Sequence, residues 1–327
     1  MKQQKNANLN MLFVIDPLES LVPGHDTSLA VMEEADRRDH SVWWCTLHDL
    51  RLARKKPEAT LRRIRYAKKK WEEVEKRDLP LEKMNIIFMR KDPPFNIDYV
   101  MATSILSYTN KKRTIILNDP DALRTFNEKL GIFEFTEYIP DTIVTKCKGT
   151  LASFLKKHKK IVLKPLELNS GHGIFVLEHG DKNRGSLLEM MTDGEQKYIM
   201  AQRYLPEIKH GDKRVIILDG EVIGAVNRIA PPHDHRSNLH TGATPRKIKL
   251  TADNMEMCQD IAKRLKTMGI YFAGLDLIGN YITEINVTSP TGIVEIEKLY
   301  GVQLQRNVVD FFEKISGSGA HRLARRA

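Results

Sequence analysis

The chain has 327 residues, of which 41% are hydrophobic and 29% charged, which is enough for two or three packed subdomains. Its longest apolar runs, such as Met11 to Ile15 and Tyr271 to Ile278, have the length of strands and fall far short of the roughly 20 residues of a membrane-spanning helix. The first ten residues are polar and lack the apolar stretch of a secretory signal. Cys45, Cys147 and Cys258 are too far apart for a CxxC metal or redox motif. We therefore expect a cytoplasmic protein that does not contact membranes.

The formal net charge is +10, and much of it lies in the basic run Arg51 to Lys70 and in Arg322, Arg325 and Arg326. The basic run leads into glutamates 72, 73 and 75, so a solvated helix or loop accounts for it. A cleft for anionic substrates would also use positive charge, through electrostatic steering. Nucleic-acid binding is a third reading, and net charge alone does not separate the three.

Short apolar strands alternate with a helical pattern in the first third of the chain. The expected elements are strands at Met11 to Ile15, Asn85 to Met89 and Thr114 to Leu117, and a helix at Ser28 to Arg38. This alternation predicts a small parallel α/β domain over about residues 11–122. Ligand-binding residues in such sheets lie just past the strand ends, where Asp16 and Arg90 occur.

After Pro140 the pattern changes to paired strands, typical of antiparallel α+β structure. Asp219-Gly220 is a strong hairpin signal between two of them. A helix with Ile261, Leu265 and Met268 on one face precedes a final strand pair, and the tail from Ser316 to Ala327 is predicted to be disordered. The expected elements are strands at Thr142 to Thr145, Ile161 to Leu163, Gly173 to Leu177, Tyr198 to Gln202, Val215 to Leu218 and Glu221 to Asn227, and a helix at Leu151 to His158.

Five motifs give the most specific signal: RKDPPF at 90–95, NEKL at 127–130, LKPL at 163–166, YLPEIKHGDKR at 204–214 and TEINVTSPT at 283–291. In combination they resemble the bacterial glutathione synthetase family of the ATP-grasp superfamily, from about Phe13 to Ile315. The resemblance implies an α/β fold with a parallel α/β (pre-ATP-grasp) domain followed by an ATP-grasp fold of two α+β subdomains. The expected boundaries are 1–122 for the substrate-binding domain, 123–206 for the central lid, 207–315 for the catalytic subdomain and 316–327 for the basic tail.

An ATP site needs cations for the triphosphate and a slot for adenine, and the resemblance assigns Lys129 and Lys164 to the phosphates. Lys164 closes an apolar strand, so its stem would pack on the sheet while its amine reaches into a cleft. The resemblance also implies a hinge whose backbone meets the adenine edge, with Asp212 approaching the ribose. This hinge comprises Gln202, Arg203, Tyr204 and Leu205.

The loop from Glu167 to Gly173 departs from the family pattern because it has fewer glycines. Fewer glycines restrict the positive-φ conformations with which backbone amides wrap a phosphate. Gly171 and Gly173 remain, and we expect a working phosphate lid with altered mobility.

His233, Asp234 and His235 have the side chains of metal ligands, but their Pro-rich surroundings favour an exposed loop. The resemblance implies that the segment Ile229 to Arg246 is a flap that shields an acyl phosphate from water.

The implied reaction joins γ-glutamylcysteine to glycine: ATP phosphorylates the cysteinyl carboxylate, and glycine's amine then displaces phosphate. Arg214 and Arg228, on adjacent strand-like segments, would face the negative charge that develops. The dipeptide would be held by Arg90, through a bidentate grip on a carboxylate, and by Asn286, Ser289 and Thr291. The cysteines are assigned no role and are expected in the core or at incidental positions.

Asp276, Glu284 and Asn286 are the expected ligands of magnesium, with manganese as an alternative, since all three offer hard oxygen atoms. Glu284 and Asn286 share a strand face. A two-residue turn at Gly279-Asn280 would place Asp276 on the opposite face. We therefore predict a three-residue turn, or an equivalent one-residue bulge, that pairs Asp276 with Glu284.

Two alternatives stay open: another ATP-grasp carboxylate–amine ligase, such as one that adds glutamate to a protein tail, and a non-catalytic nucleotide- or nucleic-acid-binding protein. The motifs RKDPPF and NVTSPT favour the dipeptide ligase, with no nucleic-acid partner. The resemblance also implies a homo-oligomer, a homotetramer in particular.

Overall fold

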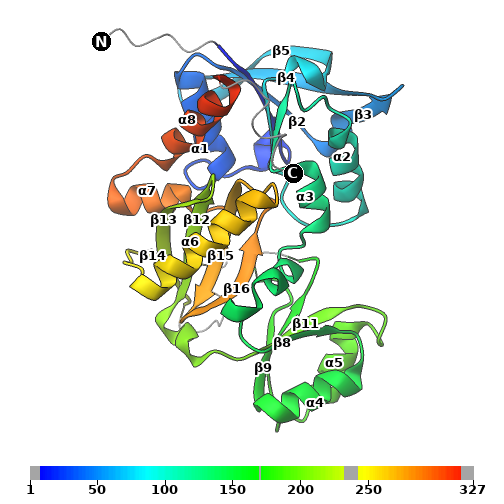
Figure 1. Ribbon diagram of the computed structural model, residues 1–327. Coiled ribbons are helices and arrows are strands. Elements are labelled where there is room, and N and C mark those ends of the chain that lie inside the picture. Colours follow the sequence, from blue (N-terminus) through cyan, green and yellow to red (C-terminus); the bar gives the residue numbers. More distant parts are fainter. Residues whose placement is uncertain (1–7, 169–170, 232–241, 318–327) are drawn as a thin grey trace.

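The computed structural model describes residues 8–168, 171–231 and 242–317. Within these ranges the chain forms three β-sheets, which follow one another in sequence (Figure 1). The divisions predicted after residues 122 and 206 fall between the sheets, and as domain boundaries they stay predictions. No helix of the described ranges is long and apolar enough to cross a membrane.

The N-terminal sheet has the strand order β3-β4-β2-β1-β6-β7, with β5 paired to β4. Strands β2, β1, β6 and β7 are parallel, whereas β3, β4 and β5 pair in antiparallel fashion. The prediction of a parallel domain is therefore correct for one half of this sheet and wrong for the other. Its elements are β1 (Asn10–Val14), α1 (Thr27–Arg37), β2 (Ser41–Cys45), β3 (Leu50–Ala53), β4 (Lys56–Ala67), β5 (Lys70–Pro80), β6 (Ile86–Met89), α2 (Ile97–Ser107), β7 (Ile115–Leu117) and α3 (Pro120–Thr125).

The basic run lies in this antiparallel half, so its reading as a helix or loop is wrong. Arg54-Lys55 and Lys68-Lys69 form two-residue turns, and all four residues have positive φ values between 49° and 65°. Such turns usually contain Asn-Gly or Asp-Gly, so these basic pairs gave no hairpin signal. Acidic partners offset part of the charge, since Arg62 contacts Asp49 and Arg63 contacts Glu75, each at 3.0 Å.

The middle sheet forms a separate subdomain at the end of the molecule opposite the N-terminal sheet (Figure 1). Its strand order is β10-β9-β11-β8, and all pairs are antiparallel. Side chains of its two helices and four strands share one small core. The elements are β8 (Thr142–Thr145), α4 (Lys148–His158), β9 (Lys160–Pro165), β10 (Phe175–Glu178), α5 (Arg184–Thr192) and β11 (Ile199–Arg203).

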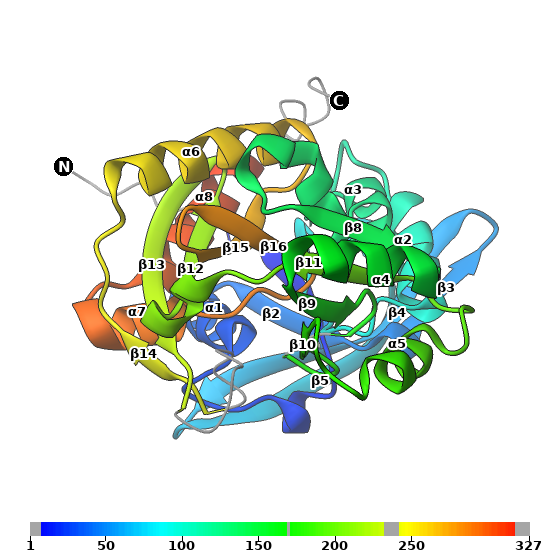
Figure 2. The same cartoon turned by 90° about the horizontal axis from the view of Figure 1, so that it is seen from below.

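The third sheet has the antiparallel order β14-β13-β12-β15-β16, and Asp219-Gly220 forms the predicted hairpin turn between β12 and β13. Helices cover both of its faces (Figure 2). Val215 and Ile217 share a core with α6, while the alternate residues Ile216 and Leu218 pack with α7 and α8. The elements are β12 (Asp212–Leu218), β13 (Glu221–Ile229), β14 (Thr244–Arg246), α6 (Ala252–Thr267), β15 (Phe272–Ile278), β16 (Tyr281–Asn286), α7 (Ile293–Tyr300) and α8 (Leu304–Gly317).

A shared core joins the third sheet to the N-terminal sheet. The Phe88 ring of β6 meets Phe272 of β15 at 5.6 Å and Phe312 of α8 at 5.3 Å between ring centroids. Helix α8 continues through Ser316 and Gly317, so the predicted disordered tail begins two residues too early; residues 318–327 lie outside the described ranges. Strand β6 is thereby packed against β15 and α8.

Candidate active site

The carboxylates predicted to bind metal lie on one face of the third sheet. Asp276 of β15 pairs with Glu284 of β16, and Asn286 is two residues further along β16. The turn itself has two residues, because Ile278 pairs with Tyr281, so the longer turn is wrong. The predicted alternative, a one-residue bulge, is confirmed: the register shifts after Asp276 and leaves Thr283 as the extra residue. That shift turns Asp276 to the face of Glu284.

Asp276 is held by two buried arginines, one from the adjacent strand β12 and one from the next strand, β13. Arg214 of β12 donates from Nε and Nη2 to the two carboxylate oxygens, at 2.6 and 3.0 Å. Arg228 of β13 lies 3.0 Å from the same carboxylate and donates to Asp212 Oδ2 at 2.5 Å. The structure thus brings together four of the predicted site residues, all with side chains at most 14% exposed.

The two aspartates respond differently to this shared burial. Burial would raise the pKa of Asp276, but the charges of Arg214 and Arg228 outweigh it and lower the pKa to about 2. Burial raises the pKa of Asp212, which has one close arginine and the negative Asp276 beside it. Among the described residues, Asp212 Oδ1 and Arg228 Nε are buried without a hydrogen-bond partner. Such buried orphan groups point to a position where a polar ligand binds.

Both predicted phosphate lysines lie beside the carboxylates. Lys164 lies one residue before the end of β9 in the middle subdomain, is 7% exposed, and donates to the Thr283 carbonyl oxygen at 3.3 Å. Lys129 Nζ donates to the Leu168 carbonyl oxygen at 2.6 Å and to Glu284 Oε1 at 3.2 Å. Burial lowers the pKa of Lys164, while Glu284 opposes that shift. The lysine amines therefore sit between the middle and third sheets, where their charges have little competition from water.

The predicted hinge connects these two sheets. Gln202 is buried and donates to Thr142 Oγ1 at 3.2 Å. The amides of Arg203 and Tyr204 already donate to carbonyl oxygens of Asp141 and Lys160. Buried Leu205 follows directly, at the point where the chain leaves β11 for β12.

The two glycines of the predicted phosphate lid both have positive φ, +77° at Gly171 and +69° at Gly173. A Cβ at Gly173 would come within 2.8 Å of Pro165, so a side chain there would meet both strain and a clash. Residues 169–170 of this loop, and 232–241 of the predicted flap with His233, Asp234 and His235, lie outside the described residues. The two ends of the flap are joined by pairing of β13 with β14.

The loop that follows β16 is fixed by four buried side chains from distant parts of the chain. Glu128 Oε1 accepts from the amides of Val287 and Thr288, at 2.9 and 3.0 Å, and from Thr288 Oγ1 at 2.7 Å. Asn118 Nδ2 donates to the Val287 carbonyl oxygen at 3.0 Å. Two consecutive carbonyl oxygens further along the loop accept from arginines: Arg90 Nη2 donates to the Pro290 oxygen and Arg214 Nη1 to the Thr291 oxygen, both at 3.0 Å.

Sequence reasoning missed Glu128 and Asn118, because their partners lie more than 150 residues away and are mostly backbone atoms. The motif NEKL was the one available signal for Glu128. Together they fix the backbone from which Ser289 and Thr291, the predicted dipeptide contacts, extend.

Arg90 lies beneath this loop and is only 2% exposed. Besides Pro290, it donates to Ser28 Oγ at 3.1 Å, and its guanidinium lies over the rings of Phe88 and Phe272. Nε and Nη2 are thus used within the protein, whereas Nη1 is buried without a hydrogen-bond partner among the described residues, so the bidentate grip on a substrate carboxylate stays a prediction. The structure places Arg90 where it supports the substrate loop from within.

The side-chain oxygen atoms of Asp276, Glu284 and Asn286 suit a hard divalent cation, provided that the Asn286 amide is turned over. Asp276 accepts four hydrogen bonds, from Arg214, Arg228 and Asn286 Nδ2, so it offers no spare lone pair as it stands. Asn286 Nδ2 also donates to the Gly274 carbonyl oxygen at 3.2 Å, so turning the amide over would put its oxygen beside two acceptors, Asp276 Oδ2 and the Gly274 oxygen, an arrangement that a shared cation stabilises.

The cysteines take no part in this constellation. Cys45 and Cys258 are buried, as expected of core residues, whereas Cys147 is exposed at the start of α4.

Several solved structures with the same fold are titled ATP-grasp ligases, and others are titled synthetases. The crystal structure titled D-cycloserine synthetase DcsG has a TM-score of 0.67 at 12% identity and covers 92% of this chain and 99% of its own. D-alanyl-alanine synthetase A from Vibrio cholerae O1 biovar eltor has a TM-score of 0.60 at 11% identity and covers 94% and 99%. At these identities the likeness shows the fold: an N-terminal α/β domain followed by an ATP-grasp unit.

Sequence comparison is more specific. The model of the prokaryotic glutathione synthetase N-terminal domain matches residues 9–124, and that of the ATP-grasp domain of the same family matches residues 128–301. Glutathione synthetase of Nostoc sp. strain PCC 7120 is 41% identical over 318 residues, which cover 94% of this chain and 98% of that protein. That of Escherichia coli O157:H7 is 40% identical over 305 residues, with 92% and 96% covered.

The fold, the facing lysines and carboxylates, and these matches define an ATP-dependent carboxylate–amine ligase that uses ATP and a divalent metal. The chain belongs to the prokaryotic glutathione synthetase family.

Proposed function

We propose that this chain ligates γ-glutamylcysteine to glycine at the expense of ATP, through an acyl phosphate on the cysteinyl carboxylate. The observation that supports this best is the bulged register of β15 and β16, which places Asp276, Glu284 and Asn286 on one face of the third sheet. Lys129 and Lys164 contact β16 beside these residues, at Glu284 and at the Thr283 carbonyl oxygen. Transfer of a phosphoryl group from ATP to a carboxylate needs cations, here the lysines and a metal ion, positioned around both anions.

ATP binds between the middle and third sheets in this proposal. Lys129 and Lys164 hold the phosphates, and Gly171 and Gly173 let the lid backbone close over them. The Leu205 amide serves the adenine edge, because the Arg203 and Tyr204 amides are used within the protein. Asp212 binds the ribose through Oδ1, which has no partner among the described residues.

The dipeptide lies along the loop after β16, with Asn286, Ser289 and Thr291 as its contacts and Arg90 as a positioning residue behind them. Arg228 Nε, buried and unpartnered among the described residues, faces the charge that develops as phosphate transfers. Arg214 keeps Asp276 ionised and the Thr291 carbonyl oxygen in place.

Magnesium is the divalent ion that we assign to Asp276, Glu284 and Asn286, and manganese is the second candidate. Bound there with ATP, the ion would neutralise charge on the transferring phosphoryl group.

The function is tested by the release of ADP and phosphate, which should require γ-glutamylcysteine and glycine together and equal the glutathione formed. ATP hydrolysis of the same rate without either substrate, or turnover with a glutamate-ending protein tail in place of the dipeptide, would contradict the proposal.

Glu128 gives a prediction about loop geometry. Burial, with Glu284 nearby, raises the pKa of this carboxyl, and its Oε1 accepts three hydrogen bonds from the loop. We expect Glu128→Ala to raise the KM for γ-glutamylcysteine at least about tenfold, because three hydrogen bonds to the loop are lost. Glu128→Gln keeps an acceptor oxygen and should recover most of this loss.

Steady-state kinetics with each substrate varied in turn would check this, and the KM for ATP should change less than about twofold in both variants. Equal loss for ATP and dipeptide, or no recovery in Glu128→Gln, would show that Glu128 does not act through the loop.

The homotetramer and the cytoplasmic location stay predictions. Sedimentation velocity across a concentration series would test the first, with a fourfold chain mass expected and a monomer contradicting it.

A further inference from the structure

Helix α2 of the N-terminal domain is apolar on two opposite faces. The residues of its inner face that pack into the core are Tyr99, Ala102 and Leu106. On its outer face Ile97, Met101 and Tyr108 are 65%, 51% and 51% exposed. Figure 1 shows this helix at the outer edge of the N-terminal domain, beside β3 and α3. A helix that is apolar all round is normally covered all round, so the outer face of α2 indicates a further contact.

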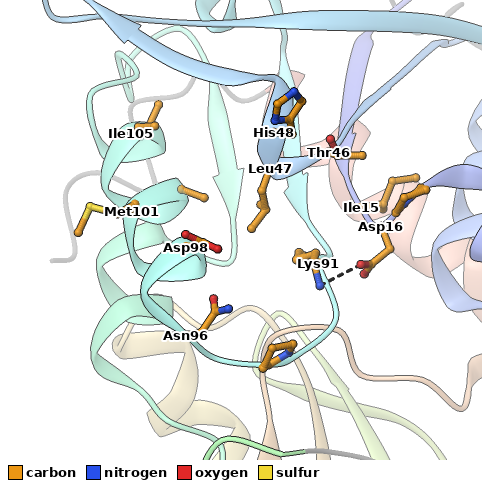
Figure 3. A pocket seen from close by; sticks show the side chains of 13 residues that line it. Ile15, Asp16, Thr46, Leu47, His48, Lys91, Asn96, Asp98, Met101 and Ile105 are labelled. Carbon is orange, nitrogen blue, oxygen red and sulfur yellow. Dashed lines mark ion pairs between the residues drawn. The ribbon is translucent and has the colours of Figure 1, made fainter.

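The exposed apolar side chains form one stripe along α2. Residues three or four apart on a helix are neighbours, and Ile97, Met101, Ser104 and Tyr108 follow this spacing. Figure 3 shows Met101 pointing away from the ion pair that is drawn in the neighbouring pocket. Ser104, in the middle of the stripe, is small, so a second helix can approach it closely. Large apolar side chains gathered in one exposed stripe mark a contact surface, unlike the single ones that any surface carries.

The two ends of α2 carry opposite charges. Asp98 lies in the first turn, and Lys111, Lys112 and Arg113 follow the last turn. Lys111 pairs with Asp119 at 2.8 Å. Asp98 and Lys112 are exposed, and neither has an ion-pair partner within the described part of the chain. A second α2 that runs antiparallel to the first would bring the acidic end of each helix to the basic end of the other, so this surface is complementary to itself.

We infer that the stripe on α2 binds a second copy of this chain, with the two α2 helices packed antiparallel about a two-fold axis near Ser104. This arrangement places Met101 against Tyr108 of the second copy, and Asp98 near Lys112 of the second copy. Each contact occurs twice by symmetry. Thioether–ring contacts at the centre and charge pairs at the rim are favourable in such an interface. The inference concerns assembly and does not rest on the proposed reaction.

Exchange of the two charges tests the two-fold arrangement. Asp98→Lys and Lys112→Asp each place like charges together at both ends of the interface, so each should weaken self-association about 30-fold or more. The double variant Asp98→Lys/Lys112→Asp restores both pairs in reversed order and should regain an association constant within about threefold of the unaltered chain. The two residues are roughly 21 Å apart along one helix, so this rescue requires two copies. Sedimentation velocity over a concentration series measures the association constants.

A second set of variants tests the apolar stripe. Tyr108→Asp should halve the mass of the assembly at a concentration where the unaltered chain is fully associated, whether that assembly has two chains or four. Met190→Asp is the matched control: Met190 is 62% exposed on α5 of the middle subdomain, and its substitution should leave the mass unchanged.

Cross-linking locates the axis. In a Cys147→Ser background, in which the remaining cysteines are buried, Ser104→Cys should form a disulfide between two copies under mild oxidation, because facing positions near the axis lie within disulfide reach. Glu256→Cys, at an exposed position of α6, should not.

Three outcomes would overturn the inference alone: an assembly whose mass is unchanged in Tyr108→Asp, a double charge variant that does not regain affinity, or a mass that falls when residues 318–327 are removed, which would assign the contact to that segment. An unaltered chain that stays monomeric at about 0.1 mM, far above the Kd of a stable assembly, would overturn the inference and the predicted homotetramer together.

Discussion

Replacing Lys164 with methionine should reduce kcat/KM for ligation by roughly 10³-fold while leaving the protein folded. The amine is buried, has one hydrogen bond at 3.3 Å, and carries a charge whose proposed partner is the triphosphate. Methionine keeps the apolar stem against β9 and removes a buried charge, so the melting temperature should stay the same or rise. Ligation kinetics and thermal unfolding of the same preparation would check both parts.

A matched control is Lys69→Met. Lys69 occupies the turn between β4 and β5 with a φ of 65°, and methionine accepts this conformation no worse than lysine. Ligation should stay within about twofold of the unaltered enzyme. Near-normal turnover in Lys164→Met would show that Lys164 does not bind the phosphates. A large loss of ligation in Lys69→Met would show that the hairpin of β4 and β5 contributes to the active site.

The second large effect is expected at Asp276, where activity and stability should fall together. Asp276→Asn keeps the shape but leaves Arg214 and Arg228 buried with Asp212 as their remaining carboxylate. Breaking a buried ion pair on one side costs about 3–5 kcal/mol, so the melting temperature should drop by roughly 10 °C. Loss of a proposed metal ligand should lower kcat at least about 10³-fold.

Glu284→Gln separates these two effects. Glu284 is 15% exposed and pairs with Lys129 alone among the described ion pairs, so its loss should cost little stability. Its loss of activity should nevertheless match that of Asp276→Asn if both residues bind the same cation. Full activity in Glu284→Gln, measured at saturating magnesium and again at limiting magnesium, would contradict a shared metal site.

Three of the four parallel strands, β1, β6 and β7, could be predicted from the sequence because each is a short run of buried apolar residues, whereas β2 was not predicted. The hairpin of β4 and β5 could not, since Ala59, Leu61 and Ile64 are buried among charged neighbours and the turns are basic pairs. Many residues of β4 and their partners in β5 are charged, so the sequence of the hairpin resembles that of a solvated helix.

The register of β15 and β16 was predicted from the need to bring three metal ligands to one face, against the register that the turn residues alone favour. Gly279-Asn280 favoured a two-residue turn, which is what forms, but that turn alone places Asp276 on the wrong face. The requirement that three ligands share a face predicted an extra residue, and the bulge at Thr283 supplies it. The motif thus constrained the pairing more strongly than the turn residues did.

Contacts that join distant segments could not be predicted. Arg90 follows a strand end, as a substrate-binding residue would, yet the packing of β15 and α8 over β6 buries it. Asn118 and Glu128 bind backbone atoms of a loop that reaches them only once the sheets assemble.

The central claim is that a phosphorylated cysteinyl carboxylate links ATP cleavage to peptide-bond formation. It is tested most directly by γ-glutamylcysteine labelled with ¹⁸O in the cysteinyl carboxylate. Attack of that carboxylate on the γ-phosphorus, followed by displacement by glycine's amine, breaks the carbon–oxygen bond and leaves the labelled oxygen on phosphate. The account predicts one ¹⁸O in the inorganic phosphate for each glutathione formed. Phosphate that carries no ¹⁸O, with the departing carboxylate oxygen found in water instead, would contradict it.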